Sequence, residues 1–135
     1  MMKIQRQITL TVALVLIALG VAACGSNSTP TKAVQTLFNA VKNKDPKAYK
    51  SVMSKENLDM MEKVAKEQKT TVDDMLKEVL NKEEMSKMPD KLETQNETIA
   101  SDGKTATVEV KDEKGKWQKV NLVKEDDGWK IAGGV

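Results

Sequence analysis

The hydrophobic pattern of this chain changes its period near Pro89. Before this residue, apolar residues recur every three or four positions, which is the spacing of one helical face. After it, apolar residues alternate with polar ones, which is the spacing of a strand with one buried face. Proline cannot donate a backbone hydrogen bond inside a helix, so Pro89 marks the end of the helical part. The pattern therefore predicts an α+β domain with its helices first.

Four amphipathic helices are predicted before Pro89, and each follows a residue that can cap it. Thr29 and Asp45 each precede a proline, which favours the first position of a helix. Ser54 can cap a third helix, and Thr71 begins a variant capping box with an acid three residues later. The apolar faces consist of Val34, Leu37, Phe38 and Val41; Ala48, Tyr49, Val52 and Met53; Leu58, Met61, Val64 and Ala65; and Val72, Met75, Leu76, Val79 and Leu80.

Four strands are predicted after Pro89, and a glycine lies in each gap between them. Because the gaps are short, consecutive strands are expected to pair as antiparallel neighbours. Ala106, Val108 and Val110 give the sheet one apolar face, and we expect the helices to cover it with Leu37 and Phe38 toward the sheet. The predicted strands are residues 92–99, 105–110, 117–124 and 129–132.

The first 24 residues predict export and a lipid anchor. Lys3 and Arg6 precede an apolar run of 16 residues, 8–23, that ends in small residues, as is typical of a secretory signal peptide. A permanent membrane-spanning helix usually needs about 20 apolar residues, so the length favours a cleaved signal. The run ends in Val21, Ala22, Ala23 and Cys24, which resembles the lipobox of bacterial lipoproteins.

The lipobox resemblance implies cleavage between Ala23 and Cys24, a thioether-linked lipid on Cys24 and fatty acyl chains such as palmitate. Cys24 is the only cysteine, so no internal disulfide can form and a lipid would account for the lone thiol. We therefore expect a signal peptide over 1–23, a flexible lipidated tether over 24–30 and a folded domain over 31–135. The protein is expected on the extracytoplasmic face of a bacterial membrane.

Charge gives no argument for a nucleic-acid partner. The chain has 22 Lys and Arg against 20 Asp and Glu, and loss of Lys3 and Arg6 with the signal leaves 20 against 20. Nucleic-acid binding needs a concentrated basic face, which a neutral and evenly mixed domain lacks. Attachment to the membrane is therefore expected to come from the lipid rather than from charge.

Two motifs in the mature chain carry a family resemblance. The first comprises Pro30, Ala33, Val34, Leu37, Phe38, Ala40, Val41, Asp45 and Tyr49, and the second Gly103 to Val108 with Gly128 to Ile131. Together they resemble a small nuclear transport factor two-like domain, especially a domain-of-unknown-function family of short bacterial lipoproteins. The resemblance implies a cone, in which helices pack on a curved four-stranded antiparallel meander around a pocket. Tyr49 and Trp117 are candidates for its mouth, with core packing as the alternative.

This chain has few residues that could act in catalysis. It contains no histidine, and a lipidated Cys24 leaves no thiol nucleophile. The adjacent acids at 73–74, 83–84 and 126–127 are expected to be helix caps or solvated side chains. No catalytic residue, metal or cofactor is therefore predicted. The methionines are expected to pack in the core, and only Met85 and Met88 leave a copper(I) site open as an alternative.

These observations predict a non-enzymatic, lipid-anchored binding or interaction domain at the cell envelope. Its expected partner is a small apolar ligand, a peptide or a protein. One alternative is a hydrolase or isomerase that uses the cone pocket, and another is a structural spacer. A buried carboxylate in a deep pocket would favour the enzyme, a dry pocket would favour a ligand, and a filled interior would favour protein interaction.

Overall fold

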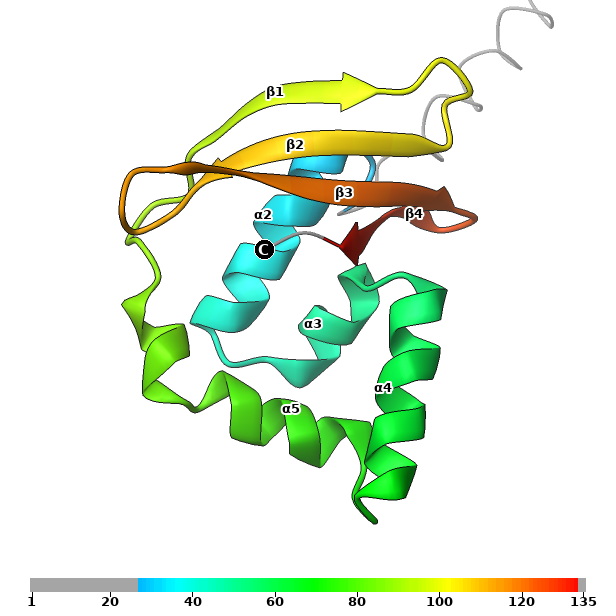
Figure 1. Cartoon of the computed structure of the whole chain (residues 1–135), viewed down its shortest axis with the longest axis vertical. Coiled ribbons are helices and arrows are strands. Elements are labelled where there is room, and N and C mark those ends of the chain that lie inside the picture. Colours follow the sequence, from blue (N-terminus) through cyan, green and yellow to red (C-terminus); the bar gives the residue numbers. More distant parts are fainter. Residues whose placement is uncertain (1–26, 134–135) are drawn as a thin grey trace, which may run out of the picture.

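The computed structural model describes residues 27–133, in which helices precede a sheet (Figure 1). No helix among these residues is long and apolar enough to cross a membrane. The predicted signal peptide, its cleavage motif and Cys24 lie outside the described residues. The elements are α2 (Pro30–Lys42), α3 (Pro46–Val52), α4 (Lys55–Glu67), α5 (Val72–Leu80), η1 (Glu83–Lys87), β1 (Thr94–Ile99), β2 (Thr105–Lys111), β3 (Trp117–Glu125) and β4 (Gly128–Gly133).

The helix starts confirm the capping residues that the sequence predicts. The side-chain oxygens of Thr29, Asp45, Ser54 and Thr71 each accept a backbone N–H from the first turn of the following helix. At α5 the capping is reciprocal, because the Thr71 hydroxyl accepts from the Asp74 N–H at 3.1 Å and donates to the Asp74 carboxylate at 2.9 Å. Each such cap contributes about 1 kcal/mol to helix stability.

The strands form the predicted antiparallel meander in the order β1-β2-β3-β4. The sheet curves over the helices (Figure 1), and the α+β fold is confirmed. In the register of β2 and β3, Val108 lies opposite Val120 and Ala106 lies opposite Leu122. All four of these side chains are buried, so the alternating pattern places one apolar face toward the helices. β1 begins at Thr94, and Leu92, expected inside the strand, packs against the core from the segment before it.

The space between the sheet and the helices α2 and α3 is filled by apolar side chains. Leu37 packs against this cluster as expected, whereas Phe38 is buried outside it, with its ring 5.7 Å from the Lys42 ammonium. Phe38 follows Leu37 by one residue and so points about 100° away around the helix. The buried members of the cluster are Ala33, Val34, Val52, Met53, Ala106, Val108, Val110, Val120, Leu122, Trp129 and Ile131. We call α2, α3 and the sheet the body.

The helices α4 and α5 form a separate arm below the body (Figure 1). α5 buries Leu76 and Leu80, which form a small cluster with Val41 of α2. α4 buries only Ala65, although the sequence predicts a wider inward face. Leu58, Met61 and Val64 of that face are half-buried. We call α4 and α5 the helical arm.

The segment expected as a flexible tether over 24–30 is packed from Asn27 onward. Asn27 is 6% exposed; its carbonyl accepts the Trp129 N–H at 2.9 Å, and its side-chain amide donates to the Ser51 carbonyl at 3.3 Å. A Cβ at Gly128 would lie 2.7 Å from the Asn27 carbonyl oxygen, so only glycine permits this approach. We call this contact of Asn27 with Ser51, Gly128 and Trp129 the N-terminal clasp. It corrects the expectation of a free tether up to the helix.

Candidate functional site

The two aromatic residues predicted for a pocket mouth lie in different surroundings. Tyr49, on α3, packs against both apolar clusters, and burial raises the pKa of its hydroxyl. Trp117 begins β3, is 39% exposed, and lies with its ring 5.7 Å from the Lys111 ammonium. Neither residue lines the two hollows described below. Tyr49 therefore contributes to packing where the two apolar clusters meet, whereas Trp117 lies at the surface.

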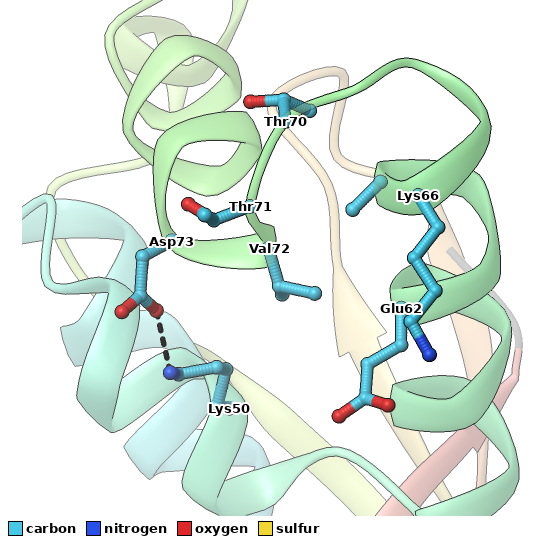
Figure 2. A pocket seen from close by; sticks show the side chains of 8 residues that line it. Lys50, Glu62, Lys66, Thr70, Thr71, Val72 and Asp73 are labelled. Atoms are coloured by element: carbon cyan, nitrogen blue, oxygen red, sulfur yellow. Dashed lines mark ion pairs between the residues drawn. The ribbon is translucent and has the colours of Figure 1, made fainter.

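A groove of about 290 Å³ lies where α3, α4 and α5 meet, and we call it the arm groove (Figure 2). Its lining combines apolar side chains, two threonines and charges of both signs. In Figure 2, Glu62 and Lys66 stand on the wall formed by α4, and Lys50 and Asp73 point toward one another on the opposite side. The lining residues are Lys50, Glu62, Ala65, Lys66, Thr70, Thr71, Val72 and Asp73.

The turn between α4 and α5 shapes one end of the arm groove. Lys69 adopts a left-handed conformation with φ of 56°. The Thr70 N–H donates to the Ala65 carbonyl at 2.9 Å and the Lys69 N–H donates to the Lys66 carbonyl at 3.1 Å. This hydrogen-bond pair is the Schellman pattern that ends a helix. Thr71 then caps α5 directly, so the two helices diverge around the small side chain of Ala65.

An ion pair links α3 and α5 on one side of the arm groove. The Lys50 ammonium on α3 lies 2.5 Å from a carboxylate oxygen of Asp73 on α5. The hydrogen bond from Lys50, reinforced by the charges of Lys50 and Lys77, lowers the pKa of Asp73. Asp73 therefore stays ionised at neutral pH. The groove thus offers an apolar floor, hydroxyl groups and a rim with both charges.

A second hollow, of about 330 Å³, lies beside the turn between β3 and β4 and is lined by Lys55, Glu125, Asp126 and Asp127. Glu125 accepts the Lys55 N–H at 2.9 Å. The hydrogen bond from Lys130 lowers the pKa of Asp127. Within residues 27–133, no group of three or more His, Cys, Asp or Glu side chains is arranged to hold a metal ion.

The three pairs of adjacent acids lie at the surface, and Met85 and Met88 differ in their surroundings. Residues 73–74 form the first turn of α5, residues 83–84 lie in the exposed η1, and residues 126–127 lie in the β3–β4 turn. The expectation that these acids are caps or solvated side chains is confirmed. Met88 packs against the small cluster of the arm, whereas Met85 is 37% exposed.

The sequence analysis missed Lys130, which is only 6% exposed. Its ammonium donates to the Ser51 carbonyl at 2.6 Å and to the Asp127 carboxylate at 2.8 Å. Strand alternation predicts that the side chain of Lys130 lies on the opposite face of β4 from those of Trp129 and Ile131. It does not predict that other residues cover that face. Among residues 27–133, the buried polar side chains are those of Asn27, Ser54 and Lys130, and none of these is a carboxylate.

Comparison with known proteins gives one match. The family described as "Domain of unknown function (DUF4878)" matches residues 22–132. The matched region includes Cys24 and all of the described helices and strands except the last residue of β4. Neither a curated protein nor a solved structure matches this chain.

Proposed function

The chain belongs to the DUF4878 family, whose description assigns no activity, and we propose that it is a lipid-anchored, non-enzymatic interaction domain. Its anchor is a lipid on Cys24, and its partner is a protein segment held in the arm groove. The observation that carries this proposal is the contrast between a filled interior and an open groove. Because apolar side chains of the described residues pack together between the helices and the sheet, recognition is assigned to the surface.

The anchor is supported by the order of residues at the start of the chain. Lys3 and Arg6, the apolar run and Val21-Ala22-Ala23-Cys24 follow the order of a lipoprotein signal. Two or more acyl chains hold a protein stably to a bilayer, where one chain does not. The anchored domain would be held on the extracytoplasmic face of a bacterial membrane.

The proposed fold family is the nuclear transport factor two-like superfamily. Helices that cover one face of a curved antiparallel meander agree with what that resemblance implies. Members with a ligand cavity need open space at the middle of the sheet. Here Val108, Val120 and Leu122 are at most 1% exposed and pack with the helices, which favours interaction through the outer surface.

The lining of the arm groove suits a peptide segment of a partner protein. Ala65 and Val72 offer apolar contact, and the hydroxyl groups of Thr70 and Thr71 are close to the backbone turn. Rim charges of both signs match the mixed side chains of a folded protein rather than one uniformly charged ligand. Protein interfaces of this kind combine an apolar centre with a polar rim.

The electrostatics support an interaction domain over a hydrolase or isomerase. A general base works best with a pKa near the operating pH, which for a carboxylate requires a raised pKa. Hydrogen bonds from Lys50, Gln118 and Lys130 instead lower the pKa values of Asp73, Asp112 and Asp127, respectively. These carboxylates are therefore stabilised as anions.

The anchor is tested by the mass of the mature protein isolated from membranes. We expect a chain that starts at Cys24 and carries the added mass of a diacylglycerol, with or without a further acyl chain on its amine. Cys24→Ser is expected to remain an uncleaved precursor without lipid. A Cys24→Ser chain that is processed normally would contradict the proposed anchor.

The arm groove is tested by photo-cross-linking in intact cells. A photoreactive amino acid at Glu62, inside the groove, is expected to give one discrete protein adduct, and the same amino acid at Asn121, on the exposed side of β3, is not. Lys66→Glu reverses a charge on the rim and is expected to reduce the adduct several-fold. Lys63→Glu is the matched control, because Lys63 lies on the same helix, is exposed and does not line the groove. An equal loss in both variants, or no adduct at Glu62, would refute the proposal.

A further inference from the structure

We infer that one end of the body rests directly on lipid headgroups and that the arm groove is turned away from the membrane. The membrane end consists of the N-terminal clasp, the start of α2 and the turn between β3 and β4. The inference rests on the lipid anchor proposed above and adds to it an interaction surface. Its occupant is a phospholipid headgroup layer.

The chain between the proposed lipid and the folded domain is short. Consecutive Cα atoms are 3.8 Å apart, so three steps from Cys24 to Asn27 span at most about 11 Å. Asn27 is 6% exposed and belongs to the packed domain. A lipid on Cys24 therefore holds the surface around Asn27 within about 11 Å of the membrane interface.

The N-terminal clasp joins Asn27 directly to two parts of the body, β4 and α3. Its carbonyl accepts from the Trp129 N–H of β4 at 2.9 Å, and its side-chain amide donates to the Ser51 carbonyl of α3 at 3.3 Å. The Ser51 carbonyl also accepts from the buried Lys130 ammonium, which reaches Asp127 in the turn. The clasp therefore transmits the position of the anchor to β4, to α3 and to the β3–β4 turn.

The membrane end carries charged groups of both signs. Lys32 and Lys55 are exposed there, as are Asp126 and Asp127. Glu97 accepts from the Thr31 N–H at 2.9 Å and Glu125 accepts from the Lys55 N–H at 2.9 Å, so two further carboxylates lie at this end. Phosphocholine and phosphoethanolamine headgroups carry both a phosphate and an ammonium group. A surface that exposes charges of both signs is complementary to both groups of such zwitterionic headgroups.

The helical arm extends away from the membrane end. α4 begins at the membrane end, because the Lys55 N–H donates to Glu125 at 2.9 Å and the Ser54 N–H donates to the Ile131 carbonyl at 3.0 Å. Its 13 residues span about 20 Å at 1.5 Å per residue. Figure 1 shows α4 running away from the sheet to the connection with α5. Lys66 and Thr70 of the arm groove lie at that far end.

The orientation is tested with two labels in the lipidated protein. Cys24 is the only cysteine, and its lipid leaves no free thiol, so Asp126→Cys or Glu67→Cys introduces one site for a fluorophore. Each labelled protein is bound to phosphatidylcholine vesicles that contain headgroup-nitroxide lipids. Quenching at position 126, in the β3–β4 turn, is expected to exceed quenching at position 67, at the end of α4, several-fold. Equal quenching, or stronger quenching at 67, would overturn the inference.

A length variant tests the short connection itself. Ten Gly and Ser residues inserted between Ser26 and Asn27 add a flexible segment with an end-to-end distance of about 17 Å. Quenching at position 126 is expected to fall toward the value at position 67, and unchanged quenching would contradict the inference. If the unmodified protein carries no lipid and does not bind the vesicles, the anchor itself fails. Stable binding with equal quenching refutes only the orientation.

Discussion

The body and the helical arm differ in how much apolar surface they bury. In the body, eleven buried side chains form one cluster between two helices and the sheet. In the arm, α4 buries one residue and α5 buries two. Helices gain most of their stability in proteins from packing of an apolar face. The body therefore supplies most of the buried apolar surface of the domain, and the arm is held by few buried side chains.

The same difference separates two proposed roles. The body carries the N-terminal clasp, through which a lipid on Cys24 would position the domain. The arm carries the groove, whose walls are formed by helices with few buried side chains. Weakly held elements open at lower cost and are common at binding sites. A partner bound in the arm groove would therefore change the structure of the arm at a lower free-energy cost than that of the body.

Truncation of a core residue in the body is expected to have the largest effect. Leu122 is 1% exposed and lies opposite Ile131 in the sheet, so Leu122→Ala is expected to lower the free energy of unfolding by about 2–5 kcal/mol. Met61→Ala, on the half-buried face of α4, is expected to cost less than about 1 kcal/mol. Urea denaturation of residues 25–135 measures both values. Equal losses in the free energy of unfolding for the two variants would contradict the proposed difference between body and arm.

Disruption of the N-terminal clasp is expected to have the next largest effect. Gly128 has φ of +123°, and a Cβ there would lie 2.7 Å from the Asn27 carbonyl oxygen. Gly128→Ala is therefore expected to lower the free energy of unfolding by about 1–3 kcal/mol. Gly103→Ala is the matched control, because Gly103 also has a positive φ, +69°, but has nothing within 4 Å of its Cβ position. A loss at Gly103 as large as that at Gly128 would show that the clasp contributes nothing.

Loss of the α5 cap tests the arm by itself. Thr71→Ala removes the hydrogen bonds with the Asp74 N–H and carboxylate and is expected to cost about 1 kcal/mol. Amide hydrogen exchange is expected to rise in α5 and to stay unchanged in β2 and β3, because their cluster does not include α5 residues. Increased exchange throughout the sheet would show that arm and body unfold as one unit.

The smallest expected effect is the acid dependence of the Asp127–Lys130 pair. The hydrogen bond from Lys130 lowers the pKa of Asp127 in the folded protein. The pair therefore stabilises the fold above about pH 4, the ordinary range of an aspartate, and this contribution is lost as pH falls through the lowered pKa. Asp127 is 73% exposed, so the contribution is below about 1 kcal/mol.

Thermal unfolding between pH 7 and pH 2 measures this contribution. Asp127→Asn is expected to reduce the loss of stability on the acid side. Asp126→Asn removes the same charge from the same turn and leaves the contact with Lys130 in place, so it is expected to keep the acid response of the unchanged protein. Identical curves for all three proteins would exclude the pair as a source of pH dependence.

Local signals in the sequence were sufficient for the elements of the fold. Thr29, Asp45, Ser54 and Thr71 act on N–H groups two or three residues away, so their role is visible in the sequence. The alternation of residues 105–110 likewise indicates which face of the sheet is buried. The end of the helical part at Pro89 and the glycine in each turn then define the order of the elements.

Contacts between distant residues explain what the sequence could not show. Asn27 meets Ser51 and Trp129, which are 24 and 102 positions away in the numbering. Lys130 follows the alternation of β4, and its contact with the Ser51 carbonyl joins residues 79 positions apart, which no local pattern indicates. The arm groove depends on the angle between three helices, which no local pattern encodes. The predicted roles of Tyr49 and Trp117 rested on residue type alone, and packing places them apart from the groove.

Hydrogen exchange measured by mass spectrometry on residues 25–135 tests the division between body and arm most directly. Amides of β2 and β3 are expected to exchange only through global unfolding, because their strands lie at the centre of the sheet and contribute to the buried cluster. Amides of α4 are expected to exchange at least tenfold faster, because α4 buries only Ala65. Protection of α4 equal to that of β2 and β3 would contradict the account.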